Sequence, residues 1–176
     1  MRVLLAKNSG FCFGVRRAVE MAEALAGERG SVYTYGNIIH NEEVVSELEQ
    51  KGVHSISDIS ALKAGDTLII RAHGAPPAVY EQARALDLKL EDATCPFVKR
   101  IHTIVQKAAS EGRKVFIAGK PQHPEVVGIC GWAGEGAVVL QSAEDARMAP
   151  FAQFAVLVSQ TTLPEETFFA IRDTLK

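Results

Sequence analysis

The sequence has few cysteines, no strong excess of charge of one sign and no long apolar run. Three cysteines at uneven spacing argue against a disulfide framework and leave metal or redox chemistry open. A net charge of −2 creates no field that would attract nucleic acid or an anionic membrane. The apolar runs are too short to cross a bilayer, and the N-terminus lacks the pattern of a signal peptide. We therefore expect a cytoplasmic protein with no nucleic-acid or membrane partner.

One unit recurs along the chain: a short apolar run, a polar cluster and then an amphipathic helix. The apolar runs are typical of buried strands, and they stand at Val3–Ala6, Val32–Tyr35, Thr67–Ile70, Leu88–Leu90, Val115–Ala118 and Phe154–Val158. Helices are expected after them, where apolar residues recur at helical spacing or where prolines open a first turn. Alternating strands and helices favour an α/β fold with mostly parallel sheets flanked by helices.

The chain is expected to form two small α/β lobes of similar construction. The segment from Gly112 onward has strands of its own, and no low-complexity linker separates the two halves. We therefore predict a first lobe over residues 1–95 and a second lobe over residues 96–176, packed closely against each other.

The chemically reactive side chains follow the predicted strands. In open α/β sheets, ligands bind beyond the carboxyl ends of the strands. We therefore expect one edge of the fold to carry Cys12, His40, His73, Cys95, His123, Glu125 and Thr161.

Two of the cysteines share a setting. Cys12 and Cys95 each stand just before a predicted helix, where backbone N–H groups and the helix dipole favour a thiolate. Thiolates suit zinc and iron–sulfur clusters, although free cysteines are often small buried side chains. The matching loops favour metal ligation by this pair. Cys130 lies among apolar residues at the expected start of a helix, and we interpret it as part of the core.

His40, His73 and His123 each precede a predicted helix, in a loop that also contains a glycine. Imidazoles there could donate to a phosphate, and the glycines would let the backbone approach it. A lone loop histidine is usually a cap or a surface residue, but three in equivalent loops favour function. His54 and His102 fit no such loop and are interpreted as structural.

Glu125 and Thr161 each allow two interpretations. A carboxylate in a first helical turn interacts favourably with the helix dipole, but beside a metal it could be a proton donor. The hydroxyl of Thr161 could cap a helix or hold a carboxylate and a ligand in place. The residues alone leave both alternatives open.

Six motifs, in order through essentially the whole chain, resemble those of the hydroxymethylbutenyl diphosphate reductase (LytB/IspH) family of the non-mevalonate isoprenoid pathway. Each motif is weak alone, but the ordered set is specific. The motifs are Gly10–Val15, Gly36–Asn41, Arg71–Gly74, Asp92–Pro96, His123–Glu125 and Ser159–Thr162.

The resemblance implies a reductase that converts 4-hydroxy-3-methylbut-2-enyl diphosphate to isopentenyl and dimethylallyl diphosphate, with electrons from ferredoxin or flavodoxin. It implies three α/β lobes around a 4Fe–4S cluster that three cysteines hold, Cys12 and Cys95 being two of them. His40, His73 and His123 would bind the diphosphate of the allylic substrate. Glu125 would donate a proton, and Thr161 would position both Glu125 and the substrate hydroxyl.

The sequence departs from the family in one respect. The third cysteine ligand and a later Ser-x-Asn phosphate-binding motif belong to the family's third lobe, which is absent before Lys176. We therefore expect this chain to be inactive by itself. Two alternatives remain: a zinc-dependent hydrolase or lyase that uses Cys12, Cys95 and one histidine, and a non-catalytic phosphate-binding module.

Overall fold

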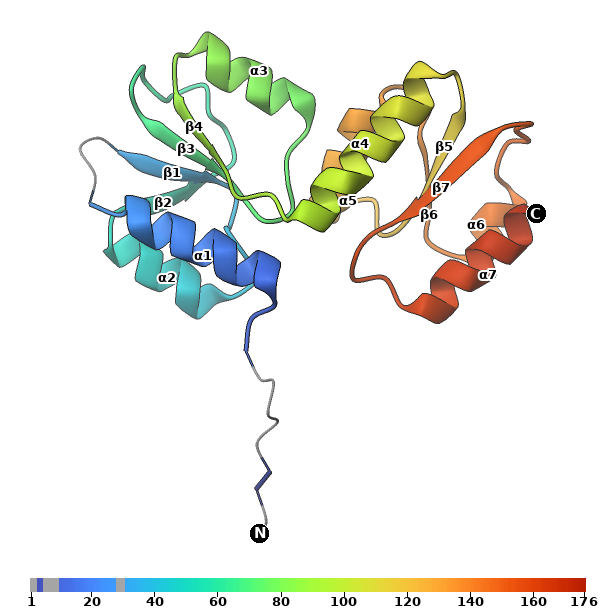
Figure 1. Cartoon of the computed structure of the whole chain (residues 1–176), viewed down its shortest axis with the longest axis horizontal. Helices are drawn as coiled ribbons and strands as arrows, with labels where there is room; N and C mark the ends of the chain where they lie inside the picture. Colours follow the sequence, from blue (N-terminus) through green and yellow to red (C-terminus); the bar gives the residue numbers. More distant parts are fainter. Residues whose placement is uncertain (1–2, 5–9, 28–30) are drawn as a thin grey trace.

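The computed structural model describes residues 3–4, 10–27 and 31–176. Its strands form two separate parallel sheets, and helices cover both faces of each sheet (Figure 1). The predicted fold class, two small α/β lobes with parallel sheets, is therefore confirmed. The predicted boundary between residues 95 and 96 lies between the two sheets, and it stays a proposal.

The first sheet has the strand order β2-β1-β3-β4. Its strands are β1 (Val32–Tyr35), β2 (Val53–Ile56), β3 (Thr67–Ile70) and β4 (Lys89–Asp92). Helices α1 (Phe13–Leu25) and α2 (Glu42–Gln50) cover one face, and α3 (Pro77–Ala85) covers the other (Figure 1). Successive residues of a strand point to opposite faces, so Ile69 joins the core under α1 and α2, whereas Leu68 and Ile70 join the core under α3.

The second sheet has the strand order β6-β5-β7. Its strands are β5 (Lys114–Ala118), β6 (Val138–Leu140) and β7 (Ala155–Ser159). Helices α4 (Pro96–Ser110) and α5 (Pro124–Ala133) share a core with Val115 and Ile117. Helices α6 (Ala143–Arg147) and α7 (Glu165–Leu175) lie on the opposite face, over Phe116 and Ala118.

Three helices next to the reactive residues begin with proline, as the sequence predicted. Pro77, Pro96 and Pro124 occupy the first turns of α3, α4 and α5. Proline suits this position because the N–H that it lacks would have no intrahelical partner. Cys95 and His123 consequently become the N-cap residues of α4 and α5.

Some local predictions were wrong or incomplete. Of the strand predicted at Val3–Ala6, only Val3 and Leu4 are described; both are exposed and neither is in a strand, and the other two residues lie outside the described ranges. Cys130 lies near the end of α5 rather than at its start, because Pro124 begins that helix earlier. It does pack partly buried against the core of the second lobe, as expected, and this burial raises the pKa of its thiol.

Candidate functional site where the two sheets meet

The topology of each sheet defines a binding edge. In the first sheet β1 lies between β2 and β3, and in the second sheet β5 lies between β6 and β7. The two strands that come next in the sequence therefore lie on opposite sides of β1 and of β5. Crevices at the carboxyl ends of such strands are where ligands bind in open α/β folds. The segments that follow these strands carry most of the residues singled out from the sequence. They are Gly36–His40 after β1, Arg71–Gly74 after β3, Gly119–His123 after β5 and Gln160–Thr162 after β7.

Three imidazoles from these segments converge. The ring centroids of His40 and His73 are 4.5 Å apart, and His123 lies 5.5 Å from the first and 5.4 Å from the second. One ring nitrogen of each residue lies within 4.8 Å of the corresponding nitrogens of the other two. His40 and His73 belong to the first lobe and His123 to the second, so the cluster spans both sheets.

Burial keeps two of these imidazoles neutral near pH 7. Desolvation by burial is the main cause that lowers the pKa of His73 to about 4, and electrostatic interactions with His40, Arg71 and His123 lower it further. Burial first, and then His40, Arg71 and Lys120, also lowers the pKa of His123. The Nδ1 atom of His123 accepts the backbone N–H of Glu125 at 3.2 Å. In a neutral imidazole the other nitrogen then carries the proton, so Nε2 of His123 is a free donor.

Glu125 is a buried acid in a fixed orientation. Its residue is 1% exposed, and its two carboxyl oxygens accept bonds from the backbone N–H (2.7 Å) and the hydroxyl (2.8 Å) of Thr161. Burial raises the pKa of Glu125, although these two bonds oppose the rise. Thr161 therefore holds the carboxyl group in place, one of the two roles that the sequence had left open.

Cys12 and Cys95 line the same pocket. They are the N-cap residues of α1 and α4, and neither side chain makes a capping hydrogen bond. The sulfur of Cys95 packs against Gly14, where a Cβ atom would come within 2.7 Å of it. Gly14 is only two residues from Cys12, so the start of α1 and the start of α4 lie side by side.

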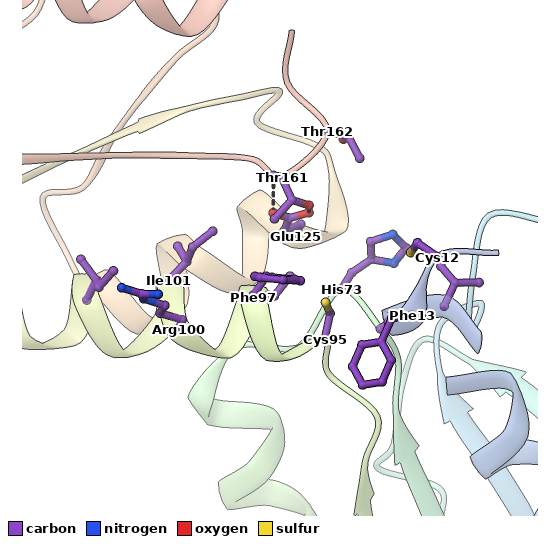
Figure 2. A pocket seen from close by; sticks show the side chains of 15 residues that line it. Cys12, Phe13, His73, Cys95, Phe97, Arg100, Ile101, Glu125, Thr161 and Thr162 are labelled. Carbon is purple, nitrogen blue, oxygen red and sulfur yellow. Dashed lines mark hydrogen bonds between the residues drawn. The ribbon is translucent and has the colours of Figure 1, made fainter. Parts of the chain in front are cut away.

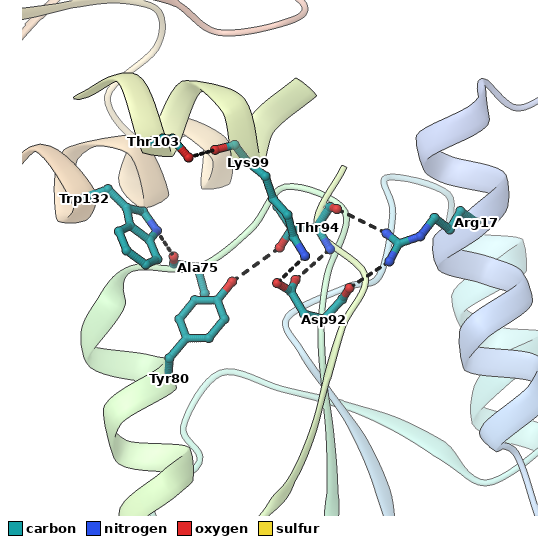
Figure 3. A network of polar contacts seen from close by, with 8 residues as sticks. All are labelled: Arg17, Ala75, Tyr80, Asp92, Thr94, Lys99, Thr103 and Trp132. Carbon is teal, nitrogen blue, oxygen red and sulfur yellow. Dashed lines mark hydrogen bonds and ion pairs between the residues drawn. The ribbon is translucent and has the colours of Figure 1, made fainter. Parts of the chain in front are cut away.

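A polar network holds these two helix starts together (Figure 3). Arg17 of α1 donates to the backbone carbonyls of Thr94 (3.2 Å) and Asp92 (3.1 Å). The Asp92 carboxylate accepts the backbone N–H of Thr94 at 2.9 Å and pairs with Lys99 of α4 at 2.7 Å. Burial would raise the pKa of Asp92, but its bonds with Lys99 and Thr94 more than compensate and lower it. The segment that leads from β4 to Cys95 is thereby fixed against α1.

The pocket between the lobes is large and partly apolar. Its volume is about 710 Å³, and Cys12, His73, Cys95, Glu125 and Thr161 all line it (Figure 2). Apolar side chains on its walls are strongly exposed, with Phe97 69% and Phe13 66% accessible to solvent. Both cysteines, one imidazole and a buried acid therefore line one pocket, whereas His40 and His123, which were expected at the same edge of the fold, are not among its lining residues.

The structure does not support the zinc site that was one of the alternatives from the sequence. Among the residues that the structure describes, the three imidazoles form a group close enough to hold a single ion. Cys12 and Cys95 do not form such a group with a histidine. The third cysteine, Cys130, does not line the pocket. The geometry thus gives no support to a zinc site made of Cys12, Cys95 and one histidine.

Two residues of the motifs have contacts that the sequence did not reveal. Arg71 lies beside the imidazoles with its guanidinium over the ring of Tyr35, 5.4 Å from the centroid, and its buried Nε has no hydrogen-bond partner. Gln160, which is 6% exposed, accepts from the backbone N–H of Lys120 (3.2 Å) and donates to the hydroxyl of Thr162 (2.6 Å). Gln160 thereby joins the segments after β5 and β7. Their places in the motifs were the only sequence signals for these two residues.

Comparisons with known proteins place these features in a family. The family profile described as LytB protein matches residues 3–176. The 4-hydroxy-3-methylbut-2-enyl diphosphate reductase of Caldanaerobacter subterraneus is 43% identical over 180 residues, which covers 100% of this chain and 62% of that protein. The enzyme of the same name from Aquifex aeolicus is 43% identical over 94% of this chain and 58% of its own length.

Solved structures agree with the sequence comparisons. The structure of the E-1-hydroxy-2-methyl-but-2-enyl-4-diphosphate reductase from Plasmodium falciparum superposes with a TM-score of 0.91 at 32% identity, over 96% of this chain and 54% of that one. A structure of (E)-4-hydroxy-3-methyl-but-2-enyl diphosphate reductase gives a TM-score of 0.83 at 39% identity, over 98% of this chain and 63% of that one. The chain spans about three fifths of the length of its curated relatives. With its ordered motifs, parallel sheets and matching profile, the chain belongs to the LytB family.

Proposed function

We propose that this chain provides two lobes of a 4-hydroxy-3-methylbut-2-enyl diphosphate reductase. The reaction replaces the hydroxyl group of the substrate by hydrogen, which consumes two electrons and two protons and releases water. The observation that carries the proposal is the convergence of three imidazoles within 4.8 Å of one another, in a site that also contains a buried carboxyl group and two thiols. The substrate is inferred from the activity for which the related enzymes are named.

The histidines are the proposed anchor for the diphosphate. A neutral His73 and a neutral His123 each offer one N–H donor, and Nε2 is the free donor of His123. Arg71 and Lys120 are close enough to depress the pKa values of these imidazoles, so the same positive charge would attract an anion. Anchoring the unreactive end of the substrate would fix the position of its hydroxyl group.

Glu125 is the proposed proton donor. Burial raises its pKa, which favours a protonated carboxyl group in the site. When the C–O bond of the substrate breaks, a proton from Glu125 would let the oxygen depart as water. The two bonds from Thr161 would aim the carboxyl group and then stabilise the carboxylate that remains.

Cys12 and Cys95 are the proposed ligands of an iron–sulfur cluster. Two thiols at helix N-caps, with no capping bonds of their own and one pocket in common, fit two positions of such a cluster. A third protein thiol is not available in this chain, since Cys130 lies elsewhere. When bound, the cluster would supply electrons and a Lewis-acidic iron. We propose ferredoxin or flavodoxin as the electron donor and the cytoplasm as the location; no helix in the described ranges is long and apolar enough to cross a membrane.

The relatives are longer than this chain, and we propose that the exposed apolar wall of the pocket contacts the additional part of such a longer protein. Phe13, Phe97 and Ile104 are 66%, 69% and 39% exposed along this wall. Large exposed apolar patches mark interaction sites or cause association. The 176-residue chain by itself should therefore associate in sedimentation experiments and should lack reductase activity. A monodisperse monomer would count against this interpretation of the surface.

Titration with inorganic pyrophosphate tests the proposed anion site on this chain. Hydrogen bonds to charged groups contribute about 1.5–3 kcal/mol, so His73→Ala should weaken binding about 10- to 100-fold. His54→Ala is the matched control, because His54 is exposed on β2 and lies outside the cluster. Equal losses for both variants would contradict the proposed anchor.

Anaerobic preparation with iron and sulfide tests the cofactor. A brown iron–sulfur chromophore that Cys95→Ala removes would support the reductase. Colourless protein with one zinc per chain would favour the hydrolase or lyase alternative. Metal-free protein that still binds pyrophosphate would favour the phosphate-binding module.

A further inference from the structure

The two lobes meet in a second contact, behind the site. Helix α5 has His123 as its N-cap residue and Glu125 in its first turn, and its far end carries Trp132, the single tryptophan of the chain. The indole N–H of Trp132 donates to the backbone carbonyl of Ala75 at 3.0 Å (Figure 3). Ala75 belongs to the first lobe and is two residues from His73. One helix therefore carries an imidazole of the cluster at one end and a hydrogen bond to the segment of another imidazole at the other.

His102 fills the space between this segment and α5. Its ring stacks on Trp132, with centroids 5.5 Å apart and planes 21° apart. A Cβ atom on Gly74 would come within 2.6 Å of the Cε1 atom of His102, and one on Gly128 would lie 3.4 Å from its Nε2. The ring is therefore enclosed between the residue that follows His73 and the middle of α5.

Glycines let the two backbones approach each other closely. A Cβ atom on Gly131 would come within 2.6 Å of the Cβ of Pro76, and one on Gly128 would lie 3.7 Å from the carbonyl oxygen of His73. A methyl group at Gly131 would therefore push the segment 73–76 away from α5. The contact is close-packed, so a shift on one side must be transmitted to the other.

If His102 only filled space in the core, it would lower the stability of the folded state. The residue is 5% exposed, and its Nε2 atom is buried without a hydrogen-bond partner. Leaving a buried polar atom unpaired usually costs free energy that an apolar side chain of similar size would not. A polar ring that fits between Gly74 and Gly128 is better explained by the geometry that it imposes on the segment of His73.

We propose that Trp132 and His102 are positioning residues that hold His73 at its spacing from His123. The 5.4 Å between those two ring centroids depends on where segment 73–76 lies relative to α5, and the Trp132 bond and the His102 stack set that relation. The expected effect on diphosphate binding rests on the proposed function. The expected effect on the position of segment 73–76 rests only on contacts outside that site.

The test uses Trp132→Phe in the 176-residue chain, because phenylalanine keeps an aromatic ring for the stack but has no N–H donor. Hydrogen exchange of the backbone amides in residues 71–75 should accelerate about 10-fold, since the segment opens more readily. Affinity for inorganic pyrophosphate should fall about 5-fold, because the imidazoles would spend less time at the required spacing. The melting temperature should change little by comparison.

Two controls separate positioning from general destabilisation. Tyr80→Phe removes one polar atom from a ring that also contacts Trp132 but leaves the bond to Ala75 intact, so exchange and affinity should stay at the wild-type values. Protein labelled with 5-fluorotryptophan keeps the N–H donor and should bind pyrophosphate as the wild type does. Because the chain has one tryptophan, its single ¹⁹F signal should shift when pyrophosphate binds.

Unchanged hydrogen exchange of residues 71–75 in Trp132→Phe would overturn the proposal. Faster exchange with unaltered pyrophosphate affinity would also overturn it, because the spacing would then not matter for binding. If the wild type does not bind pyrophosphate, the proposed function fails instead. The positioning role is then decided by exchange alone, faster exchange supporting it and equal exchange overturning it.

Discussion

The two lobes hold their parts of the site in different ways. In the second lobe, the groups are bonded to one another: Thr161 holds Glu125, and His123 accepts from the backbone of Glu125. In the first lobe, Cys12 and His40 are exposed, and Cys12 makes no capping bond. The site residues of the first lobe are held instead by the hydrogen bonds of Arg17 and by the contact with α5. The site groups of the second lobe therefore support one another, whereas those of the first lobe are supported by Arg17 of the same lobe and by α5 of the second lobe.

Glu125→Gln should have the largest effect and separates the chemistry of the second lobe from anion binding by the histidines. The rate of substrate reduction should be measured in a protein of the full length of the relatives. It should fall about 10²- to 10⁴-fold, which is the usual contribution of a general acid. Pyrophosphate affinity should change little, because the imidazoles stay in place. Single-turnover kinetics and calorimetry would measure the two quantities. Glu91→Gln, at an exposed position on β4, is the control, and an equal rate for both variants would contradict the assignment.

The contact between the lobes should make stability depend on pH. Burial lowers the pKa of His102 from 6.5 to about 4, so the folded state takes up fewer protons than the unfolded chain in this range. This contribution to the stability of the folded state is complete above pH 6.5 and is lost as the pH falls toward 4, and the pKa difference corresponds to about 3 kcal/mol of unfolding free energy. Urea unfolding at pH 7 and pH 4 should show a smaller difference for His102→Leu than for the wild type. The same pH dependence in both proteins would show that His102 is not the responsible group.

Gly14→Ala should disturb the first lobe where α1 meets α4. The new methyl group would come within 2.7 Å of the sulfur of Cys95, so the sulfur or the helix must shift. Overpacking of this kind costs about 1–3 kcal/mol of unfolding free energy. Chemical denaturation measures this loss, and the alkylation rate of Cys95 reports whether its sulfur moved. A stable variant with an unaltered alkylation rate would mean that this approach is less tight than it looks.

Thr161→Val should have the smallest effect and tests the arrangement within the second lobe. The substitution removes the hydroxyl bond to Glu125 but keeps the shape of the side chain and the backbone N–H bond. Because the hydroxyl bond lowers the pKa of Glu125, its loss should raise that pKa further. A ¹³C-NMR titration of the carboxyl group would measure the change. A lower pKa in the variant would contradict this account of how Thr161 acts.

The sequence predicted those parts of the fold that depend on contiguous apolar residues. Thr67–Ile70 and Val115–Ala118 are central strands, and both were expected at almost the same bounds. The edge strands β2 and β6 were not predicted. β2 carries His54 and Ser55 in its middle and so has no clear apolar signal, whereas β6 is a short apolar run (Val138–Leu140) that the sequence analysis did not single out. Short edge strands form because a neighbouring strand offers hydrogen bonds, which the local sequence does not record.

The site was predictable in its members but not in its supports. Cys12, His40 and His123 stand before helix starts, and that position could be seen in the sequence. The partners of Arg17, Arg71 and His102 could not, because Arg17 binds carbonyls 75 and 77 residues away and His102 contacts Gly74 and Gly128 through tertiary packing. His102 was interpreted as structural, and its burial agrees with this, but its place beside the segment of His73 required the structure.

An anion that touches both His73 and His123 would connect the two sheets. Anion binding and the packing of the two lobes would then be thermodynamically linked. A ligand that binds only when the lobes are packed together stabilises that packing. A ligand at one hundred times its dissociation constant would add about 2.7 kcal/mol to that arrangement. Melting curves recorded with and without pyrophosphate would thus report on how firmly one sheet is attached to the other.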